Sequence, residues 1–375
     1  MNDVARRSID FMKRPFVRSV LSVLFGLAVG IAGFLLVASQ VKSPPQIVEV
    51  WPIAVGVAVT VAVWFIQGTI IGLLARPKLG STKVLSTTRL YLASQAAAAV
   101  TPFMGGEIAY QLAEFKRLGL EGDDAGAVIV IRSVMNGAVM MVGALVGLIF
   151  VPYVPFIRNW FGLGSLGSKL LTAGVIALVV LAGMIAFLIV IHRRRKSGSE
   201  EEISEKEGGW EEGRGRVGKI FAKIAGKIFD YVSHVLDSLE WIWRREPRVV
   251  IGCIGLMIVY WGLYSLLGTM ALRAAGWNGN GWLVVYFAQY VLFIVIPLSP
   301  TPGGSGGAEI AFSALMSAYV PSSALLGGVI IWRILNHYSE LLVGAFLAGP
   351  RLPEDIEIAK EEIGEARQGF RAEPG

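Results

Sequence analysis

The chain carries one motif twice, in copies that lie about two hundred residues apart within its 375 residues. Each copy has a Thr-Pro pair, a cluster of glycines, a glutamate and, some two dozen residues later, an arginine inside an apolar run. The first copy runs from Thr101 to Arg132 and the second from Thr301 to Arg333. The segments that lead to the two arginines align without a gap, GAVIVIR over GGVIIWR, with four identities in seven positions. Such a repeat predicts that two halves of the chain fold alike.

The composition places these motifs in a membrane protein. Hydrophobic residues make up 54% of the chain and charged residues only 17%, and the mean hydropathy is +0.61. Apolar stretches of 18 residues or more are long enough to cross a bilayer as helices. The first stretch is too long for the core of a cleavable signal peptide, so we expect it to remain as a span. The predicted spans are residues 17–40, 50–74, 125–151, 169–191, 248–272 and 324–348.

The positions of lysine and arginine predict the orientation. If the N-terminus is cytoplasmic, 28 of the 34 basic residues fall on the cytoplasmic side, and so does the C-terminus. This bias is typical of multi-pass proteins of the cell membrane. The net charge of +6 is then a topological signal, and no basic and aromatic module for nucleic acid is visible. The basic residues that do not fall on the cytoplasmic side are Lys42, Arg158, Lys169 and Arg273, which are expected outside, and Arg132 and Arg333, which lie within spans.

The two motif copies are predicted to form re-entrant hairpins. The segment 85–118 has basic residues near both ends, so it should enter from the cytoplasm and return there, with its tip at 101–106. Its two arms are each short for a full crossing. By the same reasoning, segment 282–320 enters from outside and breaks at 297–307. The fold class predicted is an all-α polytopic membrane protein with about six full spans and two re-entrant helical hairpins in an inverted-topology repeat.

The domain organisation follows from this scheme. A flippase-like membrane domain is expected over residues 1–350, with one repeat half at 17–151 and the other at 248–348. Within it, residues 193–216 form a charged cytoplasmic linker and 217–243 an amphipathic helix, which lies either on the inner membrane surface or on the cytoplasmic face of the protein. Residues 351–375 form a polar cytoplasmic tail. The pattern Gly143-xxx-Gly147 suggests a helix-packing site.

Ionisable residues at membrane depth are the predicted functional positions, because charges there are expensive and face a cavity or each other. Glu107 and Glu309 are expected near Arg132 and Arg333. Asn336, His337 and Glu340 follow Arg333 at spacings of three, four and seven, which share one helical face, and Asn136 stands four residues after Arg132. The expected hairpin tips, whose backbone must be satisfied by protein or a wet cavity, are Thr101, Pro102, Gly105, Gly106, Thr301, Pro302, Gly303, Gly304, Gly306 and Gly307.

Each of these residues also has a purely structural interpretation. The glycines and prolines could serve only to make tight turns, and the glutamates and arginines could form structural ion pairs. The two interpretations are compatible, because an ion pair can lock one conformation and be displaced by a headgroup in another. His337 is most simply a hydrogen-bonding partner, since one histidine and one glutamate are too few for a metal site. We expect no metal and no cofactor.

The motifs resemble those of a known family. TPFMGGE followed by IRSVMN, and PLSPTPGGSGGAE followed by WRILNHYSELLVGAF, are similar to the transmembrane flippase-like domain of the lysylphosphatidylglycerol synthase family. The resemblance covers about residues 10–350 and is closest to stand-alone members, because no synthase or glycosyltransferase domain is visible. It implies a domain that moves a lipid, or a lipid-linked polar headgroup, between leaflets. By motif match it makes Glu107, Arg132, Glu309 and Arg333 the functional positions.

The resulting hypothesis is an integral membrane lipid translocase, a flippase and not an enzyme, whose partner is a membrane lipid or lipid-linked substrate. Three alternatives remain open. The protein could be a non-transporting subunit that docks a separate glycosyltransferase or synthase. It could be an intramembrane transferase with Glu107 or Glu309 as general base, although no nucleotide-binding loop, metal cluster or paired nucleophile is apparent. It could also transport a small soluble solute. The sequence does not indicate an oligomeric state.

Overall fold

The computed structural model describes residues 47–101, 104–120, 122–150, 246–279, 281–296, 299 and 301–349, with scattered positions between 28 and 39. All of these except 246–250 belong to one compact unit, Met1–Leu163 with Ile251–Gly375. The second unit, Gly164–Val250, is described only at 246–250. The predicted linker, amphipathic helix, polar tail, the span at 169–191, nearly all of the span at 17–40 and the tip residue Phe103 therefore lie outside the described residues.

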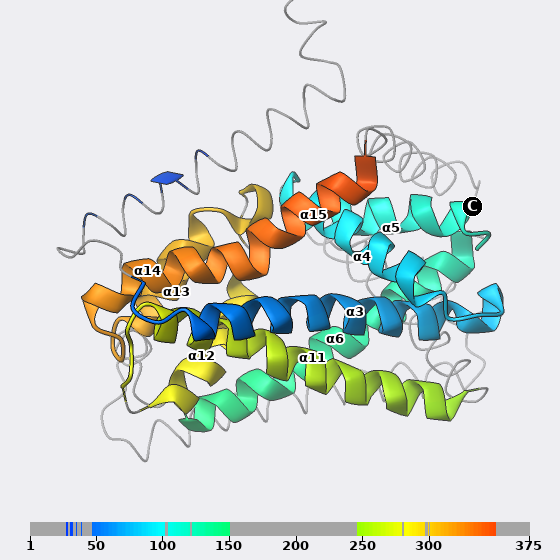
Figure 1. The fold of residues 1–375 in the computed structure, drawn as a ribbon. Helices are drawn as coiled ribbons and strands as arrows, with labels where there is room; N and C mark the ends of the chain where they lie inside the picture. Colours follow the sequence, from blue (N-terminus) through cyan, green and yellow to red (C-terminus); the bar gives the residue numbers. More distant parts are fainter. Residues whose placement is uncertain are drawn as a thin grey trace, which may run out of the picture. The chain divides into compact units, whose positions relative to one another are not determined.

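Three helices have the length and apolar composition needed to cross a membrane. They are α3 (Trp51–Leu79), α6 (Gly122–Phe150) and α11 (Pro247–Ala274), shown in Figure 1. They coincide with the spans predicted at 50–74, 125–151 and 248–272, which confirms a multi-pass, helical membrane protein. Throughout the described segments the elements are helical.

Each predicted hairpin segment forms a helix, a break and a second helix. The segment 85–118 corresponds to α4 (Val84–Ala99) and α5 (Gly106–Arg117). The segment 282–320 gives α12 (Trp282–Val295), a short 3-10 turn η3 (Pro302–Gly304) and α13 (Gly307–Met316). These helices have 16, 12, 14 and 10 residues. At 1.5 Å per residue they are roughly 15–24 Å long, whereas the hydrocarbon core is about 30 Å thick.

The α4–α5 hairpin opens toward the end of the bundle at which α3 finishes. The chain passes from α3 directly into α4, and from α5 into α6. Lys78, near the end of α3, forms a 2.8 Å ion pair with Asp124, near the start of α6. Both ends of the hairpin are therefore at this end of the bundle, on the right in Figure 1.

The α12–α13 hairpin opens toward the other end. There the start of α3 meets the end of α11, because the Val48 amide donates a 2.8 Å hydrogen bond to the Ala274 carbonyl. Trp277, three residues further on, donates its indole N–H to the carbonyl of Tyr319, just after α13, over 3.1 Å. In Figure 1, α12 and α13 accordingly lie toward the left, away from α4 and α5.

The last predicted span, 324–348, is continuous but is not one regular helix. It consists of α14 (Ser322–Arg333), a π-helical turn η4 (Ile334–Tyr338) and α15 (Ser339–Ala348). A π turn adds a residue to the helical repeat and re-aims the side chains around it. α15 packs closely on α4 at Gly344. A Cβ atom at this position would overlap the backbone carbonyl of Leu92, so only glycine allows the two helices to approach this closely.

Small residues also set the packing of α6 against α12. A Cβ atom at Gly143 would overlap the ring of Tyr290, and one at Gly147 would lie 3.1 Å from the Phe287 carbonyl oxygen. The helix-packing site predicted from the Gly143-xxx-Gly147 pattern is therefore confirmed. Without these glycines the two helices would be forced apart.

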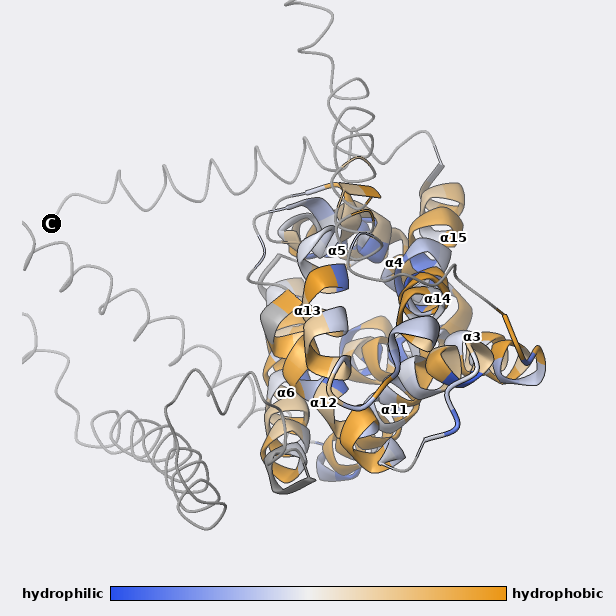
Figure 2. Cartoon of the chain, turned by 90° about the vertical axis from the view of Figure 1, so that its left-hand side faces the viewer, coloured by the Kyte–Doolittle hydropathy of each residue, from blue (hydrophilic) through white to orange (hydrophobic). Residues whose placement is uncertain are grey.

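Many of the exposed residues on the described helices are large and hydrophobic, and Figure 2 shows long hydrophobic stretches along these helices. Ile251 and Ile258 on α11, and Leu342 and Phe346 on α15, are exposed large hydrophobic residues. A water-soluble protein of this kind would place polar side chains there, since large exposed apolar patches are rare on soluble monomers. Polar and charged side chains are also buried within the same unit, among them those of Gln67, Arg132, Glu309, Arg333 and Glu340.

Candidate functional site

The first interior cluster is built around the Arg132 guanidinium on α6. Its Nη1 donates to Glu107 Oε1 on α5 over 2.9 Å, and its Nε donates to Gln67 Oε1 on α3 over 3.1 Å. Gln111, one turn after Glu107, donates to the same Glu107 oxygen over 3.0 Å. The predicted Glu107–Arg132 pairing is therefore present, and two glutamines complete its hydrogen bonds.

The second cluster has the same pair but fewer partners. Arg333 Nε, at the end of α14, donates to Glu309 Oε1 on α13 over 2.7 Å. The side chains are only 4% and 3% exposed, against 10% and 25% for Arg132 and Glu107. Arg333 Nη2 and Glu309 Oε2 are buried without a hydrogen-bond partner. The second pair therefore retains unused hydrogen-bonding capacity in an almost dry environment.

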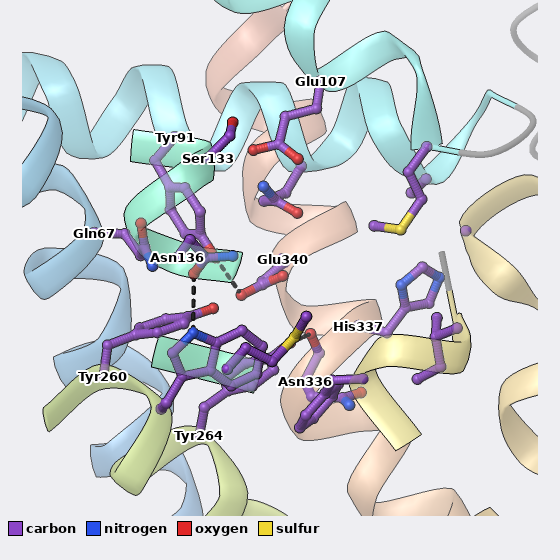
Figure 3. A pocket seen from close by; sticks show the side chains of 18 of the residues that line it. Gln67, Tyr91, Glu107, Ser133, Asn136, Tyr260, Tyr264, Asn336, His337 and Glu340 are labelled. Atoms are coloured by element: carbon purple, nitrogen blue, oxygen red, sulfur yellow. Dashed lines mark hydrogen bonds between the residues drawn. The ribbon is translucent and has the colours of Figure 1, made fainter. Parts of the chain in front are cut away.

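A cavity of about 390 Å³ lies between the two clusters (Figure 3). Its walls come from both motif copies and from α3, α6, α11 and α15. The sequence-predicted residues that line it are Glu107, Arg132, Asn136, Gly303, Arg333, Asn336, His337 and Glu340. Asn336, His337 and Glu340 line one cavity with Arg333. Asn336 and His337 belong to the π turn η4, so the four residues do not share one face of a regular α-helix.

The hairpin tips meet beside this cavity. Gly303, in η3, has a φ of 60°, and a Cβ atom there would lie 2.5 Å from His337 Cε1 and 3.3 Å from the Ala99 carbonyl oxygen at the end of α4. Glycine is therefore required at this position by backbone conformation and by space. The close approach brings the break of the second hairpin against the first.

Most other predicted tip residues shape the turns rather than the cavity wall. The Thr101 hydroxyl accepts a 2.8 Å hydrogen bond from the Gly106 amide, and the Thr301 hydroxyl donates to the Ser305 carbonyl over 2.7 Å. Pro102 lies outside the described residues. The residues that are not among those lining the cavity are Glu309, which lies behind Arg333, together with Thr101, Gly105, Gly106, Thr301, Pro302, Gly304, Gly306 and Gly307.

Met104 is a cavity residue that the glycine pattern did not single out. It has a φ of 55°, which is uncommon for a residue with a side chain. Counted back from the glutamate, it occupies the position of Gly306, whose φ is 79°. The two turns thus have a residue with positive φ at the same distance from their glutamates, and it is glycine in only one of them.

An aromatic wall was also missed. Tyr260, Trp261 and Tyr264 on α11 line the cavity, and the rings of Tyr260 and Tyr264 are stacked with centroids 5.3 Å apart. The Trp261 indole donates to Asn136 Oδ1 over 2.9 Å, and the Tyr264 hydroxyl donates to the Asn336 carbonyl over 3.2 Å. A sequence signal for this wall did exist. The three aromatic residues are one, three and four positions apart, which places them near one another on a helix, and each carries a hydroxyl or N–H group inside an apolar span. The other missed lining residues include Gln67, Tyr91, Gln95 and Ser133.

Glu340 differs from the other two interior glutamates. It is 6% exposed and accepts a 3.2 Å hydrogen bond from the Tyr91 hydroxyl, drawn as a dashed line in Figure 3. In the described part of the chain, the interior ion pairs join Arg132 to Glu107 and Arg333 to Glu309, and none joins a basic side chain to Glu340. The cavity is therefore lined by two arginines that each pair with a glutamate, and by Glu340, for which the described residues supply no basic partner.

The arrangement is suited to binding a charged polar group in an apolar surrounding. Guanidinium groups match phosphate and carboxylate oxygens through parallel N–H bonds, and the aromatic faces can contact a cation. Among the residues that the structure describes, no group of three or more His, Cys, Asp or Glu side chains could hold a metal ion.

Comparison with known proteins adds two findings. Residues 19–344 match the family described as the lysylphosphatidylglycerol synthase TM region. A UPF0104 membrane protein from Archaeoglobus fulgidus is 29% identical over 100 residues, which are 27% of this chain and 30% of that protein. The match thus spans less than a third of that relative's length.

Proposed function

The chain belongs to the family of the lysylphosphatidylglycerol synthase TM region, and from this premise we propose that it is a lipid translocase. It moves the polar headgroup of a membrane lipid between leaflets through the cavity at the hairpin tips, without changing the lipid chemically. The observation that carries the proposal is this cavity, which brings an arginine from each motif copy, Arg132 and Arg333, to one polar site inside an apolar bundle.

The hairpin geometry supports an inverted-repeat mechanism. The two hairpins open toward opposite ends of the bundle, their arms are short for a full crossing, and Gly303 of one tip contacts Ala99 of the other. In our proposal the hairpins are re-entrant, the N- and C-termini are cytoplasmic, and the protein resides in the cell membrane. Each hairpin then forms half of a barrier, and opening of one or the other exposes the cavity to one side.

The ion pairs supply the exchange site. A charged headgroup in hydrocarbon costs several kcal/mol or more. A headgroup phosphate that replaces Glu107 on Arg132 exchanges one charge-assisted hydrogen bond for another, and one that binds the unpartnered Nη2 of Arg333 forms a new bond. These bonds replace part of the headgroup's lost hydration and so lower the barrier, while the displaced Glu107, 25% exposed, faces the cavity. The acyl chains remain in the surrounding lipid.

The test is translocation by the purified protein in liposomes. Tail-labelled fluorescent phosphatidylglycerol and phosphatidylethanolamine are placed in one leaflet, and their appearance in the other is followed by a membrane-impermeant quencher. We expect movement at rates well above protein-free liposomes and no change in lipid mass.

A glycine variant at the hairpin tip supplies the matched comparison. Gly303→Val should stop movement, because the new side chain collides with His337 and the backbone cannot hold its φ of 60°. Gly255→Val is the control, because no heavy atom lies within 4 Å of a Cβ atom there. An unchanged leaflet distribution for every lipid tested, with folded protein, would favour a docking subunit. A lipid that changed in mass would favour an enzyme.

A further inference from the structure

The two motif copies are not equivalent in charge. Arg132 and Arg333 are aligned, and each has a glutamate partner. Seven residues after Arg333 stands Glu340, whereas seven residues after Arg132 stands Val139. The second copy therefore contributes an additional buried carboxyl group, which the repeated ion-pair arrangement does not require.

Among the residues that the structure describes, hydroxyl groups lie around this carboxyl group, and both arginines that line the cavity have glutamate partners. Tyr91 on α4 donates its hydroxyl to Glu340 Oε1 over 3.2 Å. The other titratable or charged side chains around the same cavity are Tyr260 and Tyr264 on α11, Glu107 on α5, Arg132 on α6, and Arg333 and His337 on the chain segment that precedes Glu340. Both arginines are already paired with other glutamates.

Resting on the translocase function proposed above, we propose that Glu340 is the proton-binding site that couples lipid movement to a proton gradient. A buried carboxyl group needs either a cation or a proton to avoid an uncompensated charge. A metal ion would require several oxygen ligands, whereas among the described residues no group of three or more His, Cys, Asp or Glu side chains could hold one, and Glu340 accepts a hydrogen bond from the Tyr91 hydroxyl. A proton needs only the carboxylate itself and a wet route, and Glu340 lines the cavity.

The same geometry explains how binding of a headgroup controls the proton. When a lipid phosphate takes the place of Glu107 on Arg132, the Glu107 carboxylate loses its counter-charge while facing the same cavity as Glu340. Added negative charge near a carboxylate favours protonation. Glu340 then takes up one proton from the cavity water as the lipid binds and returns it as the lipid leaves. With one negative charge on the lipid and one proton, the step is electroneutral.

The experiment measures the steady-state leaflet ratio of tail-labelled fluorescent phosphatidylglycerol under a pH gradient. Proteoliposomes carry an acidic outside and an inside one pH unit higher, with the membrane potential held at zero by potassium and valinomycin. One proton per lipid gives about a tenfold accumulation of the label in the inner leaflet. Without a gradient the ratio stays near one. A trapped pH dye should report acidification of the lumen that depends on the lipid.

Variants assign the coupling to a residue. In Glu340→Gln the leaflet ratio should stay near one at every gradient, and in Glu340→Asp the response should persist. Gel filtration and thermal melting establish that each variant is folded. If Glu340→Gln does not fold, the wild-type ratio alone decides whether proton coupling exists.

The outcomes separate this inference from the translocase function. Wild-type protein that moves the lipid but keeps a ratio near one under the gradient overturns proton coupling and leaves translocation standing. A full response in Glu340→Gln, or loss of the response in His337→Gln with retention in Glu340→Gln, overturns the assignment to Glu340. Protein that moves no lipid under any condition refutes the translocase function itself.

Discussion

Glu309→Gln tests whether the second ion pair holds the fold together. The pair is 2.7 Å long and nearly inaccessible to solvent. At an effective dielectric constant of about 20, two unit charges at this separation attract by about 6 kcal/mol, most of which offsets the cost of removing them from water. Removal of one partner leaves the Arg333 charge buried without a counter-charge. We therefore expect a loss of about 3–5 kcal/mol in the free energy of unfolding.

A double-mutant cycle separates the pair from the cost of the orphaned arginine. Glu309→Gln combined with Arg333→Met removes both charges, so it should recover most of the lost stability. The matched change Glu107→Gln should cost less, about 1–2 kcal/mol, because the Glu107 side chain is 25% exposed and Arg132 keeps its bond to Gln67.

The measurement is unfolding of the purified variants in mixed micelles of increasing denaturing-detergent fraction, followed by tryptophan fluorescence. Equal stability of Glu309→Gln and wild-type protein would contradict a structural role for the pair. A double variant that is less stable than Glu309→Gln would contradict the electrostatic explanation. Loss of lipid transport in a fully stable Glu309→Gln protein would instead assign the pair to the transport cycle.

Three further predictions concern topology and packing. A cysteine at the exposed Ser81 should react with an impermeant thiol reagent only from the cytoplasmic side and one at Ser322 only from outside, and reaction of both from one side would end the inverted-repeat scheme. Gly344→Val should lower the free energy of unfolding by about 1–3 kcal/mol through overlap with Leu92, while Gly252→Val, with open space around it, should not. Gly306→Ala should destabilise the protein by about 1–2 kcal/mol, because its φ of 79° disfavours a Cβ atom. Detergent unfolding measures the stability of the Gly344 and Gly306 variants. Wild-type stability of Gly344→Val would refute the packing argument, and wild-type stability of Gly306→Ala would refute the strain argument.

Local sequence determined the helices and the main charge pairs. Glycine and proline cannot continue a helix at low cost, so the breaks in the motif copies were predictable close to where α4 ends and α13 begins. The expected position within the membrane also made the two Glu–Arg ion pairs predictable. A charged side chain there needs either an opposite charge or water, and the structure contains both predicted pairs.

Only the tertiary structure decided which groups share the cavity. Tyr260 and Tyr264 lie far along the chain from Arg132 and Glu107, so their common cavity depends on how α11 packs rather than on any local pattern. Glu107 and Glu309 look alike in sequence, yet Glu107 lines the cavity and Glu309 lies behind Arg333. The packing of distant helices also distinguishes Glu340 from the other two glutamates. Its residue type shows that a buried carboxylate needs a basic partner, but only the tertiary structure shows that Arg132 and Arg333 pair with Glu107 and Glu309 instead.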